Sequence, residues 1–117
     1  MKRDMDLLRS FLLKVEEQPV NGPFTTPEVP GYSEDELYYH AKLAEDAGFI
    51  EADFTFDGFT VQRLTYAGHE FLDMAREERL WNKAKQSVLS NAGTLTVEAL
   101  KTALSMLMQK AARGMMI

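Results

Sequence analysis

The sequence of 117 residues contains no cysteine. Disulfide bonds, thiolate metal sites and cysteine nucleophiles are therefore excluded. Long apolar runs are also absent, since none approaches the roughly eighteen residues of a membrane-spanning helix. The N-terminus, MKRDMDLLRS, mixes basic and acidic residues and no apolar core follows it, which argues against a signal peptide. We therefore expect a cytoplasmic protein with no membrane partner.

Motifs for catalysis and cofactor binding are equally scarce. The sequence has no glycine-rich phosphate loop and no G-x-S-x-G nucleophile motif. The segment HEFLD at 69–73 lacks the second histidine of a zinc-binding H-E-x-x-H helix. The other histidine, His40, falls on the apolar face of its helix, where a buried ring bonded to backbone is expected. We expect no enzyme, no catalytic residue, no metal and no cofactor.

Charge is unevenly distributed along the chain, although the net charge is only −5. Residues 1–78 carry seven basic and seventeen acidic side chains, a balance of −10, whereas residues 79–117 have a balance of +5. A basic end can bind nucleic acid. Here the basic residues alternate with apolar ones, which favours helices that pack on or beside the acidic body. The segment 28–57 contains nine acidic residues and one basic residue, Lys42.

The first half of the chain predicts two helices separated by extended chain. Apolar residues recur at helical spacing over 4–18. Prolines exclude a regular helix from 24–32, which reads as extended chain with room for one short edge strand. A second helix over 33–47 begins with Ser33 and Glu36, spaced as in a capping box, and a glycine ends it.

A β-hairpin follows, with the turn predicted at Asp57–Gly58. This turn places Phe56 opposite Phe59 and lines one side of the ribbon with apolar residues. Leu64 is out of phase with that pattern. Either the second strand has a bulge near Gln62 or it ends early.

The second half of the chain predicts helices. Thr65 is expected to cap a helix that bends at the charged segment 76–79, and Thr96 a last helix after the break at 91–93. Helix, extended segment, helix, hairpin and helix is the order of a winged-helix domain. The predicted fold class is therefore α+β: a winged-helix-like domain over 1–90, with a C-terminal helix in 91–117 that packs on the domain or on a second subunit.

Three segments, MKRDMDLLRSFLLKVEE, YYHAKLAEDAGFIEA and RLTYAGHEFLDMAREERLWNKAK, together resemble a small uncharacterised family of bacterial and phage-borne proteins. That family is grouped as a domain of unknown function, and the resemblance covers about residues 1–88. It implies a winged-helix-like fold and a frequent prophage context, without catalytic residues or an established ligand. The segment LTYAGHEFL also resembles the exit from the wing in winged-helix regulators, where the glycine allows close helix packing.

The acidic character of 33–57 argues against DNA binding through the recognition-like helix, because phosphate neutralisation dominates affinity for a duplex. Interaction with protein is favoured instead, and a methionine-rich apolar last helix favours a homodimer. The expected interaction surface is formed by Asp35, Tyr38, Tyr39, Lys42, Phe54, Phe56 and Phe59. The expected dimer helix presents Leu100, Leu104, Leu107 and Met108.

The predicted function is a non-enzymatic interaction or regulatory module of bacterial or prophage origin with an unknown protein partner. The alternative is a transcriptional regulator that binds DNA through another surface. The basic patch available for that alternative consists of Arg79, Lys83 and Lys85.

Overall fold

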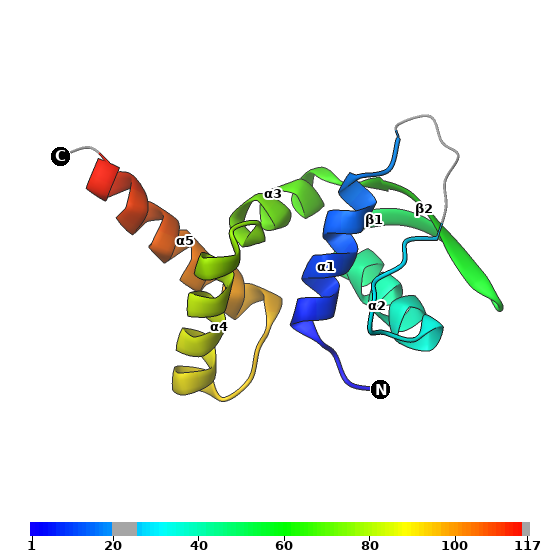
Figure 1. Ribbon diagram of the computed structural model, residues 1–117, viewed down its shortest axis with the longest axis horizontal. Coiled ribbons are helices and arrows are strands. Elements are labelled where there is room, and N and C mark those ends of the chain that lie inside the picture. The colour runs from blue at the N-terminus through cyan, green and yellow to red at the C-terminus, as the bar shows by residue number, and fades with distance from the viewer. Residues whose placement is uncertain (20–25, 116–117) are drawn as a thin grey trace. The chain divides into compact units, whose positions relative to one another are not determined.

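The computed structural model describes residues 1–19 and 26–115, and the chain divides into two compact units, Met1–Leu72 and Asp73–Ile117 (Figure 1). The fold class is α+β, as predicted: the described residues form helices and an antiparallel β-hairpin. The elements in chain order are α1 (Met5–Glu16), α2 (Glu34–Asp46), β1 (Ile50–Thr55), β2 (Gly58–Leu64), α3 (Tyr66–Ala75), α4 (Glu78–Ala92) and α5 (Val97–Met115).

Helix α1 is the central element of the first unit. The Asp4 carboxylate caps it by accepting hydrogen bonds from the backbone N–H groups of Asp6 and Leu7. Its apolar stripe packs against α2 and β2, so one helix covers both partners. The buried side chains of that stripe are Met5, Leu7, Leu8, Phe11, Leu12 and Val15.

Helix α2 spans Glu34–Asp46, one residue shorter at each end than predicted, and has the predicted residues at its two boundaries. Ser33 and Glu36 form a complete capping box, and Gly48 just after the helix has a φ of +79°. A glycine suits this left-handed conformation because it has no Cβ. Between its caps, α2 turns a narrow apolar face made of Leu37, His40, Ala41 and Ala44 toward the interior.

His40 is buried and bonded to backbone, as predicted. Its side chain is 1% exposed, its Nε2 accepts the N–H of Asp4 at 2.8 Å, and its Nδ1 lies 2.8 Å from the Glu36 carbonyl oxygen. Because a carbonyl oxygen can only accept a hydrogen bond, Nδ1 carries the ring hydrogen and Nε2 is the unprotonated nitrogen. The ring thereby joins the start of α1 to the middle of α2.

The hairpin turn lies one residue earlier than predicted. Thr55 pairs with Gly58 and Phe54 pairs with Phe59, so Phe56 and Asp57 form the turn. The predicted pairing of Phe56 with Phe59 is therefore wrong, and Phe56 extends into solvent with 99% of its surface exposed. The Asp-Gly signal was misleading because Gly58 does not take the positive φ that such a turn requires.

The predicted bulge is present at Gln62. Glu51 pairs with Arg63 while the next residue, Ala52, pairs with Val61, so Gln62 has no partner across the ladder. The extra residue brings Leu64 back to the buried side. The alternative, an early end of the strand, is excluded because β2 continues to Leu64.

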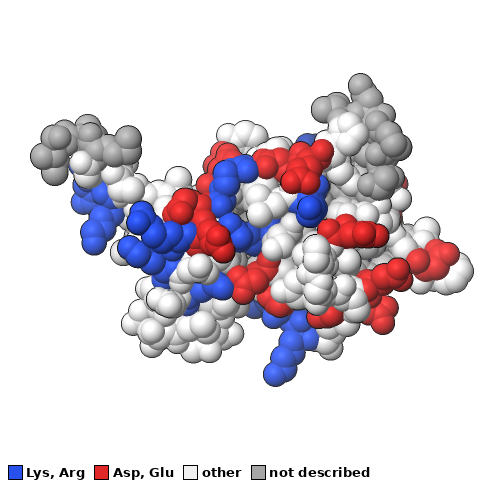
Figure 2. Space-filling view, viewed as in Figure 1, with Lys and Arg blue, Asp and Glu red and all other residues white. Residues whose placement is uncertain are grey.

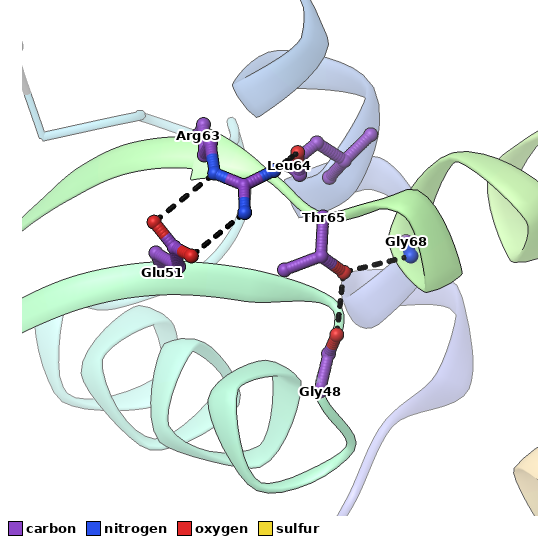
Figure 3. Close-up of polar contacts among 6 residues, drawn as sticks. All are labelled: Gly48, Glu51, Arg63, Leu64, Thr65 and Gly68. Carbon is purple, nitrogen blue, oxygen red and sulfur yellow. Dashed lines mark hydrogen bonds and ion pairs between the residues drawn. The ribbon is translucent and has the colours of Figure 1, made fainter.

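Thr65 joins the hairpin to α3 (Figure 3). Its hydroxyl accepts the N–H of Gly68 at 3.1 Å, as a helix cap, and donates to the carbonyl of Gly48. The N–H of Thr65 also donates to the carbonyl of Phe49. The end of α2, the start of β1 and the start of α3 therefore meet at one residue.

Gly68 has the packing role that the sequence suggested. A Cβ built on it would overlap the backbone carbonyl oxygen of Phe49 and lie 3.0 Å from Cγ of Leu64. Helix α3 thus approaches the chain before β1 more closely than any other residue type would allow. This approach places Phe71 against Phe49, with the two rings stacked at 4.9 Å.

The second unit is built on the pair α4 and α5. The chain breaks between α3 and α4 as predicted, and the Glu77 carboxylate caps α4. Gly93 ends α4 in the left-handed conformation and Thr96 caps α5, and the short connection between them joins two helices that pack on each other. The residue-90 boundary of the predicted domains lies inside α4, and α4 groups with α5 because the two helices contact each other.

Residues 26–32, the described part of the predicted extended segment, contain neither a strand nor a helix, whereas 24 and 25 lie outside the described residues. None of the helices in 1–19 and 26–115 combines the length and apolar character needed to cross a bilayer.

Candidate interaction surface

Helix α2 has acidic residues at both ends, and those at the two ends interact oppositely with the helix dipole. Glu34, Asp35 and Glu36 occupy its first turn, where negative charge interacts favourably with the helix dipole. Glu45 and Asp46 occupy its last turn, which contains no basic residue. Carboxylates there face the negative end of the dipole, so helix stability does not account for them.

An aromatic cluster connects α2 to the hairpin. The ring of Tyr38 meets Phe54 edge-on at 5.5 Å and Phe59 at 6.0 Å, and its hydroxyl donates to the Thr55 carbonyl at 2.8 Å. Phe59 also contacts Phe11 of α1 at 6.0 Å. The structure therefore brings together three residues of the predicted surface, but Phe59 is buried and belongs to the core.

Lys42, the one basic residue of the segment 28–57, is drawn into this cluster. Its ammonium nitrogen lies 4.2 Å from the centre of the Phe54 ring, in cation–π geometry. Asp35 is exposed in the first turn of α2, and Tyr39 is 37% exposed with its ring edge against His40. The segment 28–57 thus has nine carboxylates and one ammonium group, and Figure 2 shows acidic side chains gathered toward the hairpin end.

The hairpin strands carry two acidic side chains, of which one forms an ion pair. Arg63 of β2 donates two hydrogen bonds to Glu51 of β1, at 2.7 and 3.0 Å (Figure 3). These hydrogen bonds and the guanidinium charge hold the pKa of the Glu51 carboxyl below its usual value. Gln62, the bulge residue, donates to Asp53 at 2.9 Å. Glu51 is therefore neutralised locally, whereas Asp53 adds to the negative charge of α2 and the hairpin tip.

A cleft of about 350 Å³ lies between the start of α2 and the hairpin tip. Its floor includes Leu37 and Phe59, and carboxylates and the exposed ring of Phe56 surround it. The hydroxyl of Thr26 donates to the Phe59 carbonyl at 3.0 Å and so fixes the chain beside the hairpin. The four acidic residues that line the cleft are Glu28, Glu34, Asp35 and Asp57.

Sequence reasoning singled out only two residues of this cleft, Asp35 and Phe56, besides the buried Phe59. The others were missed because Glu28 is far from Asp57 along the chain, and the extended segment 26–32 gives no periodic signal. The one available signal was charge, since nine residues within 28–57 are acidic.

The predicted dimer helix is only partly accessible. Leu100 and Leu104 are completely buried within the chain, so they serve its own packing and do not form an outer surface. Leu107 is half-buried and Met108 is 41% exposed. Beside them, α4 and α5 form a groove of about 660 Å³, whose apolar walls include Val88 and Met106.

The alternative basic patch does not form one surface. Arg79, Lys83 and Lys85 all lie on α4. At about 100° per residue, Arg79 and Lys83 fall on one stripe of the helix and Lys85 on nearly the opposite side.

Among the described residues, no group of three or more His, Cys, Asp or Glu side chains is placed to hold a metal.

Comparison with known proteins agrees with the resemblance seen in the three segments. A family described as hypothetical protein (DUF2513) matches residues 2–94. The chain belongs to the DUF2513 family. Its match includes α1, α2, the hairpin, α3 and α4, and ends just before α5 begins.

A relative of this DUF2513 chain occurs in Haemophilus influenzae, strain Rd, under the description uncharacterized protein. The two are 37% identical over 106 residues, which cover 86% of this chain and 90% of the relative. No solved structure matches the chain.

Proposed function

We propose that this DUF2513 protein is a non-enzymatic, regulatory interaction module of bacterial or prophage origin, and that its acidic α2 face binds a basic segment of another protein. The observation that carries this proposal is the excess of carboxylates on α2, including Glu45 and Asp46 in its last turn. Acids in that position oppose the helix dipole, so a role outside the fold explains them better.

A winged-helix-like fold is part of this proposal. The order of α1, α2, hairpin and α3 supports it, with α2 in the place of the recognition helix and β1–β2 as the wing. The prolines of 26–32 replace the second helix of an ordinary helix-turn-helix. Such a scaffold presents one exposed helix beside one ribbon, an arrangement that suits a peptide as well as a duplex.

Electrostatics favours protein over nucleic acid as the ligand of this face. A DNA-reading helix places arginine, lysine, asparagine or glutamine toward the bases and phosphates. The one lysine of α2, Lys42, has its ammonium group over the Phe54 ring. Asp35 and Asp46 lie on the same stripe of α2 as each other. A basic protein segment would gain from the same charges that repel phosphates.

Binding measurements with two probes test the proposal. A labelled lysine- and arginine-rich peptide and a labelled DNA duplex are each titrated with the full chain, followed by fluorescence anisotropy at low and high salt. We expect the peptide to bind, with an affinity that falls as salt rises, and the duplex not to bind.

The decisive variant is the double charge reversal Asp35→Lys and Asp46→Lys, which should abolish peptide binding. The control, Glu17→Lys, alters an exposed carboxylate at the C-terminal end of α1, outside α2, and should keep more than half of the wild-type affinity for the peptide. Binding that survives the double reversal would contradict the proposal. Duplex binding that disappears with Lys83→Glu would support the alternative DNA-binding regulator.

A further inference from the structure

Phe56 is an aromatic side chain that the fold does not need. It occupies a hairpin turn, where Gly, Asn and Asp are usual, and 99% of its surface is exposed. Its neighbour in the turn is Asp57, an exposed carboxylate that accepts a hydrogen bond from the Thr55 hydroxyl at 2.8 Å. The hairpin therefore ends in a protruding apolar ring with a negative charge beside it, which is the composition of an anchor residue at an interface.

The groove of the second unit has the complementary composition. Helices α4 and α5 line it with small and apolar side chains, and Met106 beside it is 65% exposed. The groove has a direction, since Lys83 lies far from the α4–α5 connection and Glu98 lies next to it. A negatively charged group is therefore favoured at the Lys83 end and disfavoured at the Glu98 end.

The two units also differ in net charge. Residues 1–72 contain fourteen acidic and six basic side chains, whereas residues 73–117 contain four acidic and seven basic ones. The excess of carboxylates around the hairpin end and of lysine and arginine around α4 and α5 is visible in Figure 2. The first unit of one copy is therefore electrostatically attracted to the second unit of another.

We infer that the protein associates with itself by inserting the hairpin tip of one copy into the α4–α5 groove of a second copy. Phe56 fills the apolar part of the groove and Asp57 pairs with Lys83 at its basic end. Asp35 lines the same cleft as Phe56 and Asp57, whereas Asp46 lies at the other end of α2. The self-association is tested by variants of Phe56, Asp57 and Lys83 and the binding of a basic partner by variants of Asp35 and Asp46, so the failure of one can be told from the failure of the other.

Sedimentation equilibrium of the full chain over a wide concentration range tests the inference. We expect the wild type to self-associate and Phe56→Ala to weaken the association at least about tenfold. The matched control is Tyr66→Ala, which removes another exposed aromatic ring, 79% exposed on α3, and should leave association unchanged. Both residues are exposed, so thermal unfolding should confirm that the variants remain folded.

Charge exchange identifies the contact itself. Asp57→Lys and Lys83→Asp should each weaken self-association, and an equimolar mixture of the two variants should associate again, because the lysine tip of one meets the aspartate groove of the other. The inference is overturned by a wild type that stays monomeric at all concentrations. It is equally overturned by association that Phe56→Ala leaves intact, including association lost only with Met106→Glu, which would indicate groove-to-groove pairing.

Discussion

Replacing Gly68 by alanine tests the closest packing contact of the first unit. Two effects of opposite sign compete. Alanine is favoured over glycine inside a helix by roughly 1 kcal/mol. Against this, the new Cβ would overlap the Phe49 carbonyl oxygen and press on Cγ of Leu64, 3.0 Å away. Over-packing of a rigid interior typically costs about 1–3 kcal/mol.

The cost should lie at or above the upper end of that range, because the main obstacle is backbone and cannot rotate away. We therefore expect Gly68→Ala to lower the free energy of unfolding by about 2 kcal/mol after the gain in helix propensity. For a unit of this size the midpoint of thermal unfolding should fall by roughly 8–16 °C. Urea and thermal unfolding followed by circular dichroism measure both quantities.

Gly58→Ala is the matched control. A Cβ at Gly58 has nothing within 4 Å and its φ is not positive, so the substitution should be neutral or stabilise the protein by up to about 1 kcal/mol. If Gly68→Ala proved as stable as the wild type, the new Cβ would not meet the rigid obstacle expected at Phe49. The close approach of α3 to the chain before β1 would then be refuted.

Further predictions concern the polar groups that join the elements. His40→Leu should lower the free energy of unfolding by about 2–3 kcal/mol, since it leaves a buried N–H without its acceptor; His69→Leu, at the exposed histidine, should change it by less than about 0.5 kcal/mol. Burial and the neighbouring Asp4 carboxylate raise the pKa of Tyr32. The folded protein therefore keeps the Tyr32 proton, which the unfolded chain releases above about pH 10, so the free energy of unfolding should fall as pH rises beyond that value. The fall should be less steep in Tyr32→Phe, and urea unfolding at alkaline pH measures the difference. Thr65→Val should cost about 1 kcal/mol through loss of the α3 cap, measured in the same way, and an unchanged stability would show that the cap is dispensable.

Some residues of the proposed binding surfaces are unfavourable for the stability or solubility of the fold. Glu45 and Asp46 oppose the dipole of α2, and Phe56 exposes an aromatic ring. Each feature lowers stability or solubility slightly, and each lies where a partner can reach it. Sites of this kind are where local rules of folding and the demands of binding disagree.

What the sequence determined by itself are the features that depend on neighbours along the chain. Ser33, Thr65 and Thr96 cap their helices as predicted, and Gly48 ends α2, because a cap bonds backbone groups within a few residues. The bulge at Gln62 was also predictable, since a phase change in the apolar pattern is a local property.

Only the tertiary structure decided which side chains are accessible. The register that exposes Phe56 follows from how Phe54 and Phe59 pack under α1 and α2, and not from the Asp-Gly turn signal. Leu100 belongs to the core because the chain packs over it, although its helical stripe reads equally well as an outer surface. Glu28 and Asp57 line the same cleft although they are far apart along the chain. Their proximity results from tertiary packing, so no local sequence pattern could predict it.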